Sequence, residues 1–196
     1  MKMHIKEQKA ALRRDLTEIR NGIDFEQRRA RDARICTLCQ SLAVFRYAEK
    51  VLCYHPIRSE ADLRPLMECA LSSGKELYLP LVHKDEAGIM TFHRISSFSD
   101  LEKGSFGVME PKKELPTWEE DGESAVCFIP ALAYGRDGYR LGYGKGYYDR
   151  FLAAFSGSKV GVTYTELFLS EVPHNRFDCR ADIVVTEKGV YLTREI

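Results

Sequence analysis

The sequence has no net charge and no long apolar segment. Its 29 Lys and Arg residues balance 29 Asp and Glu residues, so the formal net charge is zero. A neutral chain has no whole-body attraction for nucleic acid or for an acidic membrane, and we expect neither as a partner. The longest apolar run, 127–134, is interrupted by Pro130 and is far too short to cross a bilayer. The start of the chain carries charges without the apolar core of a signal peptide, which predicts a cytoplasmic protein.

Paired cysteines are also scarce. Among the six cysteines, only Cys36 and Cys39 have C-x-x-C spacing, so no second pair completes a tetrahedral zinc site. The pair lies in "ARICTLCQSLAVF", where apolar residues recur at helical spacing. This context favours small buried side chains in a reducing compartment over redox or zinc chemistry.

Repeats, low-complexity tracts and long linkers are missing as well. The 196 residues suffice for one domain with a full core and are too few to expect two. A hydrophobic content of 44% and a charged content of 30% are typical of globular proteins. We therefore expect one domain that covers residues 1–196.

Helix and strand patterns alternate along the chain. Helical periodicity predicts helices over 5–20 and 26–46, and a further helix over 59–75 that begins with a Ser59 cap and stops at Gly74. Short β-rich runs predict strands over 50–55, 76–80, 89–95, 125–132 and 159–164, and a strand pair within 181–192. The alternation indicates an α/β fold: a single-domain, mostly parallel sheet flanked by helices, in a Rossmann-like open arrangement.

The densest pattern is "RLGYGKGYYDR", residues 140–150, within a stretch that holds five glycines between Gly135 and Gly146. A P-loop would need glycine where Tyr139 stands, and Ser or Thr in place of Gly146. The dinucleotide fingerprint would need glycine at Tyr147. Neither of the common phosphate-binding patterns is therefore present.

The position of this stretch still favours an anion site. It follows the predicted strand 125–132 and leads into a predicted helix, whose amino end attracts negative charge. Glycine lets the backbone approach phosphate oxygens, and a carboxylate at Asp149 suits Mg²⁺ carried by a polyphosphate. Basic residues outnumber acidic ones here, with Arg136, Arg140, Lys145 and Arg150 against Asp137 and Asp149. The alternative is a mobile glycine loop followed by a solvated, charged helix start.

The same residues carry a family resemblance. "DGYRLGYGKGYYDRFL", following "PALAYG", resembles the signature of the 5-formyltetrahydrofolate cyclo-ligase family. The similarity extends to "KAALRRDL", "CYHPIRSEAD", "GSFGVMEP" and "HNRFDCRADIVVTEKGV". The resemblance implies a ligase of one-carbon folate metabolism that uses ATP and Mg²⁺ to convert 5-formyltetrahydrofolate to 5,10-methenyltetrahydrofolate, with release of ADP and phosphate.

Site residues follow from the resemblance alone. It assigns ATP binding to Lys9, Arg13, Arg140, Leu141, Gly142, Tyr143, Gly144, Lys145, Gly146, Tyr147 and Tyr148. Among these, Lys145 and Arg140 would neutralise the polyphosphate during the reaction. It places Arg13, His55, Glu60, Phe106 and Tyr148 on the folate side, and it places Asp149 and Asp182 at Mg²⁺.

Each assignment has a plain structural alternative. Lys9 and Arg13 belong to a basic stripe at helical spacing, which is typical of a solvated helix face. For Phe106 the alternative is an aromatic side chain of the core, and for His55 it is a structural histidine at a strand end. For Asp182 it is a turn cap, and for Tyr147 and Tyr148 it is packing of the helix.

Two other functions stay open. One is a related ATP-using enzyme that activates a different small amide or acid, and the other is a non-catalytic module that binds folate or nucleotide. The segments 54–60 and 104–111 would form the organic-substrate side and so separate the first from the cyclo-ligase. The presence of Lys145 and Asp149 argues against a mere binding module. The chain is expected to be a monomer or a weak homo-oligomer.

Overall fold

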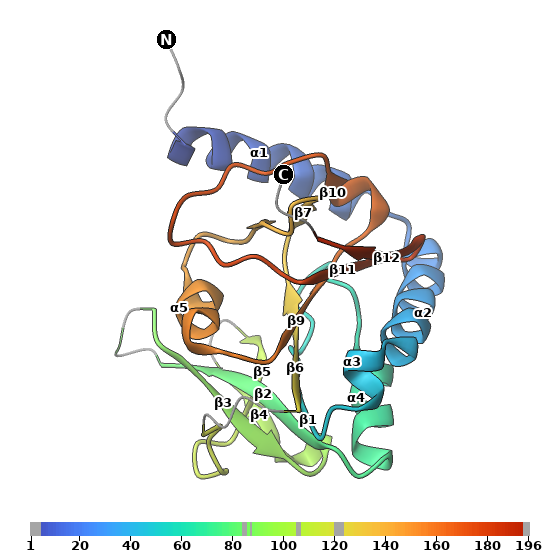
Figure 1. Cartoon of the computed structure of the whole chain (residues 1–196), viewed down its shortest axis with the longest axis vertical. Helices are drawn as coiled ribbons and strands as arrows, with labels where there is room; N and C mark the ends of the chain where they lie inside the picture. Colours follow the sequence, from blue (N-terminus) through green and yellow to red (C-terminus); the bar gives the residue numbers. More distant parts are fainter. Residues whose placement is uncertain (1–4, 84–85, 87, 105–106, 120–123, 194–196) are drawn as a thin grey trace.

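The computed structural model describes residues 5–83, 86, 88–104, 107–119 and 124–193, and its centre is a seven-stranded sheet in the order β12-β11-β9-β6-β1-β2-β3 (Figure 1). Neighbouring strands from β2 to β11 are parallel, whereas β3 and β12 pair antiparallel at the two edges. The strands of this sheet are β1 (Lys50–Leu52), β2 (Glu76–Val82), β3 (Met90–Ile95), β6 (Ala125–Pro130), β9 (Ser158–Val162), β11 (Ile183–Thr186) and β12 (Gly189–Leu192). The expected α/β fold with a mostly parallel sheet is confirmed.

The order of the parallel strands reverses beside β1. The chain passes from β1 to β2 on one side, then crosses to β6, β9 and β11 on the other. The carboxyl ends of β1 and β6 therefore form a topological switch point, which is where open α/β sheets bind their ligands. The segments that directly follow β1 and β6 are therefore candidates for the site.

Helices cover both faces and the carboxyl end of the sheet (Figure 1). In that view α2 (Phe25–Ser41), α3 (Ala43–Arg46) and α4 (Arg64–Ser72) lie on one side, and α5 (Tyr147–Ala154) lies on the other. Helix α1 (Ile5–Asn21) crosses above the central strands, next to the segment that follows β6. The first helix was expected over 5–20, and its position brings its polar face to the switch point.

The second predicted helix is interrupted. Asp24 caps α2, because its Oδ1 accepts the N–H groups of Glu26 at 3.0 Å and Gln27 at 3.3 Å. Leu42 then adopts an extended ψ of 134°, so the single helix expected over 26–46 is wrong: α2 ends at Ser41 and α3 starts after the break. The apolar periodicity continues across the break because Leu42 and Phe45 both pack into the core.

The predicted Ser59 cap is also wrong. Helix α4 begins at Arg64 with Leu63 at the cap position, although Gly74 does follow its end with a φ of 75°. The Ser59 hydroxyl accepts from Arg20 Nε at 3.0 Å and donates to Asn21 Oδ1 at 2.7 Å. Ser59 thus forms hydrogen bonds with α1 instead of capping α4.

Several short strands were not expected. They are β4 (Leu101–Lys103), β5 (Met109–Pro111), β7 (Ala133–Gly135), β8 (Arg140–Leu141) and β10 (Phe168–Leu169), and β10, β7 and β8 form a separate three-stranded sheet. The β7–β8 hairpin turns at Gly138, where φ is 87° and a Cβ would lie 2.5 Å from the Ala181 carbonyl oxygen. This hairpin carries the chain from the end of β6 into the glycine-rich stretch.

The cysteine pair belongs to the core. Cys36 and Cys39 are 3% and 0% exposed, and both are free thiols. Burial raises the pKa of Cys36 to about 12 and also raises the pKa of Cys39. The interpretation of the pair as small buried side chains is confirmed.

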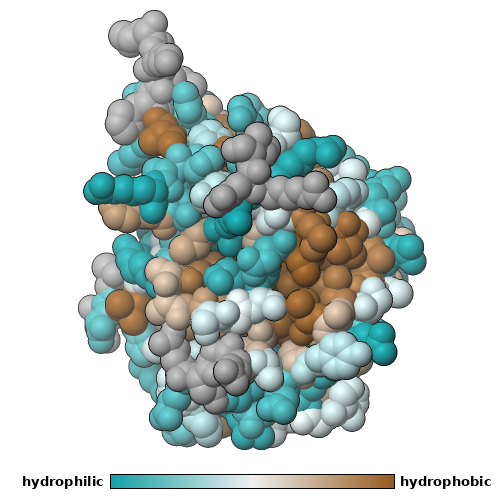
Figure 2. Space-filling view, in the orientation of Figure 1, coloured by the Kyte–Doolittle hydropathy of each residue, from teal (hydrophilic) through white to brown (hydrophobic). Residues whose placement is uncertain are grey.

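The face shown in Figure 2 is mostly mixed in polarity, and its largest apolar area lies near β11 and β12. Val190 and Leu192 of the edge strand β12 are 39% and 70% exposed. Among the described residues, no helix combines the length and the apolar character needed to span a membrane.

Candidate active site

The glycine-rich stretch forms a loop between β8 and the amino end of α5. Gly144 and Gly146 have φ values of 88° and 72°, a region that glycine enters without steric cost. Gly146 occupies the cap position of α5 and supplies no side-chain cap. Because the first N–H groups of a helix have no intrahelical acceptor, this amino end suits an anion. The expected loop-to-helix geometry is confirmed.

Helix α1 holds this loop from above through Arg13. Its Nε donates to the Gly142 carbonyl oxygen at 2.7 Å. A Cβ at Gly144 would lie 3.2 Å from Arg13 Nη2, so the backbone approaches the guanidinium closely. Burial lowers the pKa of Arg13, and the nearby carboxylate of Asp178 partly offsets this effect. Arg13 is therefore a loop-holding cation rather than part of a solvated helix face.

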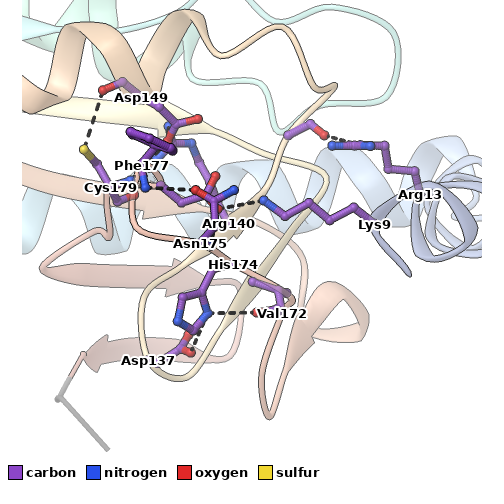
Figure 3. A network of polar contacts seen from close by, with 12 residues as sticks. Lys9, Arg13, Asp137, Arg140, Asp149, Val172, His174, Asn175, Phe177 and Cys179 are labelled. Atoms are coloured by element: carbon purple, nitrogen blue, oxygen red, sulfur yellow. Dashed lines mark hydrogen bonds and ion pairs between the residues drawn. The ribbon is translucent and has the colours of Figure 1, made fainter. Parts of the chain in front are cut away.

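Lys9 reaches the same end of the sheet, one turn earlier on α1. Its ammonium forms a 2.8 Å ion pair with Asp178, and the two side chains are only 13% and 14% exposed (Figure 3). Asp178 also accepts the Asn175 N–H at 2.7 Å, so the contact fixes the loop between β10 and β11. The basic stripe of α1 thus contacts two separate loops of the site.

Arg140 and Asp149 are paired with each other (Figure 3). The distance from Arg140 Nη2 to Asp149 Oδ1 is 2.5 Å, and the Arg140 side chain is only 5% exposed. Arg140 Nη1 donates to the Cys179 carbonyl oxygen at 2.7 Å, and the Cys179 N–H donates to Asp149 Oδ1 at 3.1 Å. Both residues were expected at ATP or Mg²⁺, and the structure joins them in one network that also fixes the 179 backbone.

The other expected metal ligand, Asp182, has a different environment. It is exposed, and its Oδ2 accepts the Lys159 N–H at 2.8 Å near the start of β9. Within the described part of the chain, no three His, Cys, Asp or Glu side chains gather as a metal cage. Mg²⁺ bound to nucleotide phosphates needs only one or two protein carboxylates. Asp149, in the first turn of α5 beside the glycine loop, fits that requirement.

Glu60 lies at the switch point. It is 8% exposed, and its Oε2 accepts the Ile57 N–H at 3.0 Å. Burial raises the pKa of Glu60 to about 7, although the positive charges of Arg20 and Arg58 work in the opposite direction. A cavity of about 10 Å³ lies beside it, with Arg20, Tyr54, Pro130 and Tyr164 also in its walls. This volume holds about one water-sized atom.

The remaining folate-side candidates differ in how much the structure says of them. His55 follows the carboxyl end of β1 and is half-buried; burial lowers its pKa, and the charge of Arg64 adds to that effect. Phe106 lies outside the described residues. Tyr148 packs edge-on against Phe92, with ring centroids 6.4 Å apart. Its hydroxyl is buried without a hydrogen-bond partner among the described residues.

Lys145 is exposed at the tip of the loop, between the two glycines of positive φ. Its carbonyl oxygen accepts from Arg150 Nη1 at 3.0 Å. This hydrogen bond restrains the backbone at residue 145 and does not involve the ammonium group. Tyr143, two residues earlier, is 40% exposed. The loop therefore presents a lysine and a tyrosine beside the amino end of α5.

Sequence reasoning missed Arg20. This residue is 2% exposed and donates from Nη2 to the Tyr143 hydroxyl and from Nε to Ser59. A signal for it was present, because Arg20 lies seven residues after Arg13 and so continues the basic stripe of α1 by two turns. Tyr139 and His174, whose rings stack at 3.7 Å, were also missed, and a contact between such distant positions has no local sequence signal.

Comparisons with known proteins identify relatives of the chain. The model of the 5-formyltetrahydrofolate cyclo-ligase family matches residues 5–187. The 5-formyltetrahydrofolate cyclo-ligase of Mycolicibacterium smegmatis is 34% identical over 142 residues, which cover 70% of this chain and 73% of that protein. The one of Escherichia coli is 29% identical over 147 residues, covering 74% and 81%. The solved structure of Aquifex aeolicus 5,10-methenyltetrahydrofolate synthetase is 36% identical, has a TM-score of 0.83, and covers 96% of this chain and 94% of its own.

Proposed function

The chain belongs to the 5-formyltetrahydrofolate cyclo-ligase family, and we propose that its loop 142–146 binds the ATP with which this enzyme converts 5-formyltetrahydrofolate to 5,10-methenyltetrahydrofolate. The observation that carries the assignment is the loop itself. Its glycines of positive φ lead into the uncapped amino end of α5, and Arg13 holds its backbone in place. A polyphosphate would accept hydrogen bonds from these N–H groups.

The chemistry explains why ATP is needed. The formyl group on N5 is an amide, so its carbon is a poor electrophile and its oxygen cannot leave. Transfer of the γ-phosphoryl group of ATP to that oxygen releases ADP and gives the carbon a leaving group. N10 then attacks the carbon, phosphate departs, and the ring closes. The protein needs no nucleophile of its own, and its task is to position both substrates and stabilise the charge of the transferring phosphoryl group.

Two cations of the loop region would stabilise the charge of the transferring phosphoryl group in different ways. Lys145 is exposed between Gly144 and Gly146, and we assign its ammonium to the β- and γ-phosphates. Arg140 is buried and donates to Asp149 and to the Cys179 carbonyl. We assign to it a fixed positive charge close to the phosphates and the orientation of Asp149. Lys9 and Arg13 would add charge from α1.

The folate would bind at the switch point, on the side of His55 and Glu60. Glu60 is held by the Ile57 N–H, so its carboxyl group has a fixed orientation. A carboxylate there accepts hydrogen bonds from N–H groups such as those of a pterin ring. Phe106 and Tyr148 would add aromatic contacts to the same substrate. The phosphoryl acceptor would then meet the glycine loop between the two segments.

Mg²⁺ would enter with the nucleotide. Asp149 offers one carboxylate beside the loop, and Asp182 would contribute only if its bond to the Lys159 N–H were given up. The ion would supply charge neutralisation on the phosphates. We further propose that the enzyme acts in the cytoplasm as a monomer or a weak homo-oligomer.

One assay tests the proposal. The protein is mixed with 5-formyltetrahydrofolate and Mg-ATP, and formation of the methenyl chromophore and of ADP is followed. We expect equal amounts of both products, and no chromophore when ATP or Mg²⁺ is left out. Release of ADP only with another amide or acid would indicate a related ATP-using enzyme. Binding of folate without any turnover would indicate a binding module.

A further inference from the structure

Arg20 is a buried cation that contacts both sides of the site. It lies near the end of α1 with 2% of its surface exposed, which is unusual for a charged residue. Burial of a charge is costly unless hydrogen bonds compensate it. The hydrogen-bond partners of Arg20 therefore indicate which segments its buried side chain connects.

The first partner belongs to the glycine loop. Arg20 Nη2 donates to the hydroxyl of Tyr143, and the guanidinium carbon lies 5.8 Å from the centroid of that ring. Arg58 lies 5.8 Å from the same centroid, so two cations flank Tyr143. Tyr143 comes directly after Gly142, whose carbonyl oxygen Arg13 holds. Arg20 thus fixes the proposed ATP loop from the folate side.

The second partner belongs to the segment that carries Glu60. Arg20 Nε donates to Ser59 Oγ at 3.0 Å, and that hydroxyl donates to Asn21 Oδ1 at 2.7 Å. Ser59 directly precedes Glu60, and both residues are more than nine-tenths buried. The planar guanidinium therefore joins residue 143 and residue 59 by two donors of fixed relative orientation.

The third nitrogen of the guanidinium has no acceptor within the described part of the chain. Arg20 Nη1 is buried and has no hydrogen-bond partner among the described residues. Arg20 and Glu60 both line the cavity of about 10 Å³ at the carboxyl ends of β1 and β6. A buried donor without an acceptor loses its hydrogen bonds to water without replacement, so an oxygen atom that reaches Nη1 would bind favourably.

We propose that Arg20 is a positioning residue that couples the two substrate sites: it ties Tyr143 of the glycine loop to Ser59, next to Glu60, and it offers its free Nη1 donor to an oxygen of the folate substrate. The proposal rests on the assignment of ATP to loop 142–146 and of folate to the Glu60 segment. A ligand that orders the loop would fix Arg20, and a fixed Arg20 would bind the second ligand with less loss of conformational freedom.

Coupling of this kind has a measurable consequence. When one ligand changes the affinity for another, the factor is the same in both directions and is typically about 5–150-fold. We expect a non-hydrolysable ATP analogue to increase the affinity for 5-formyltetrahydrofolate by a factor in that range. Calorimetry of each ligand alone, and of folate in the presence of saturating analogue, gives the factor directly.

Three variants and a control locate the coupling. Arg20→Gln and Arg20→Lys remove the fixed fork, and Tyr143→Phe removes only the acceptor of Nη2 from a side chain that is 40% exposed, so it preserves folding. Arg28→Gln is the matched control, because Arg28 also has a buried nitrogen without a partner in the described chain but donates to the Ile23 carbonyl oxygen. Thermal melts accompany each titration.

We expect the coupling factor to fall towards one in the Arg20 and Tyr143 variants and to stay at the wild-type value in the control. Either Tyr143→Phe or a folded Arg20 variant with the wild-type factor would overturn the proposal. So would a wild-type protein that binds both ligands independently, and that result would leave the proposed function standing. Failure of wild-type protein to bind 5-formyltetrahydrofolate would overturn both.

Discussion

The carboxylate of Asp149 and the guanidinium of Arg140 form a 2.5 Å ion pair through Asp149 Oδ1, the same oxygen that accepts the Cys179 N–H. Neither bond uses Oδ2, so that oxygen is the one through which Asp149 would hold Mg²⁺ on ATP. Arg140 in turn has its two terminal nitrogens engaged by Asp149 and by the Cys179 carbonyl. The pair therefore orients the carboxylate that we propose as a metal ligand at the start of α5.

This pairing predicts three effects of Asp149→Asn. The change keeps an oxygen acceptor for the Cys179 N–H and removes the negative charge opposite the buried Arg140. Loss of one partner of a buried ion pair costs about 3–5 kcal/mol, and the 25% exposure of Asp149 reduces the effect here. We expect turnover to fall strongly, the Mg²⁺ requirement to rise, and the free energy of unfolding to decrease. Mg²⁺ titrations of activity and urea unfolding measure these effects.

The double variant Arg140→Met/Asp149→Asn separates the proposed metal role of Asp149 from its pairing with Arg140. It removes both charges, so we expect it to regain part of the stability lost in Asp149→Asn without regaining activity. A folded Asp149→Asn protein with an unchanged Mg²⁺ dependence would contradict the metal role and leave Asp149 as the partner of Arg140 alone.

The sequence predicts the parts of the site that depend on local signals. The glycine loop, the start of α5 and the first helix all follow from residue types within a few positions of one another, because backbone conformation at a glycine and the amino end of a helix are local properties. Strand β8 is only two residues long, so it has no periodicity to detect. The hairpin that delivers the loop was missed for this reason.

Contacts between residues that are far apart in the chain could not be predicted from the sequence. Ser59 looks like a helix cap, yet it contacts Arg20, which is 39 residues away. Arg140 looks like a phosphate ligand, yet it pairs with Asp149 once the hairpin and α5 fold together. In each case the tertiary contact satisfies a buried charge that would otherwise be costly; it replaces the predicted cap role of Ser59, and the phosphate role of Arg140 stays a prediction.

Glu60 makes stability depend on pH. Burial raises its pKa from 4.5 to about 7, so the folded protein binds this proton more tightly than the unfolded chain. The resulting stabilisation is fully present below about pH 4.5 and is lost as the pH rises to about 7. Glu60→Gln is neutral throughout and lacks this dependence.

We therefore expect the wild type to lose stability relative to Glu60→Gln as the pH rises from about 5 to about 8, by up to about 3 kcal/mol. Other titrating groups cancel in the difference between the two proteins. Urea unfolding of both proteins at several pH values measures it. A difference that stays constant with pH would mean that Glu60 keeps an ordinary pKa.

Variants on the folate side should affect only one substrate. Phe106→Ala and Glu60→Gln should weaken binding of 5-formyltetrahydrofolate and leave ATP affinity within a few-fold. Loss of an aromatic stacking contact with a nucleobase costs about 1–3 kcal/mol, and a pterin has a similar size and π system. Calorimetry with each ligand separately measures both affinities. Equal losses for the two ligands would indicate damage to the fold instead.

Lys145 carries the sharpest prediction for catalysis. Its ammonium projects from an exposed position between Gly144 and Gly146, where the backbone is suited to surround phosphate. In a loose phosphoryl-transfer transition state, charge shifts among the γ-oxygens and the bridging oxygen, and a fixed cation stabilises it. Loss of one such electrostatic partner costs about 2.7–4 kcal/mol. Lys145→Met should therefore lower kcat by about 10²–10³-fold.

The same variant should change folate binding and stability much less, because an exposed loop lysine contributes little to the core. Lys145→Arg should restore activity only in part, since the planar guanidinium is bulkier and spreads its charge. Lys113→Met, which removes an exposed lysine after β5, is the matched control and should retain wild-type kcat. Steady-state kinetics and thermal melts on the three variants measure these effects. A Lys145→Met protein with near wild-type kcat would remove Lys145 from the reaction and leave the backbone of the loop and the amino end of α5 as the phosphate site.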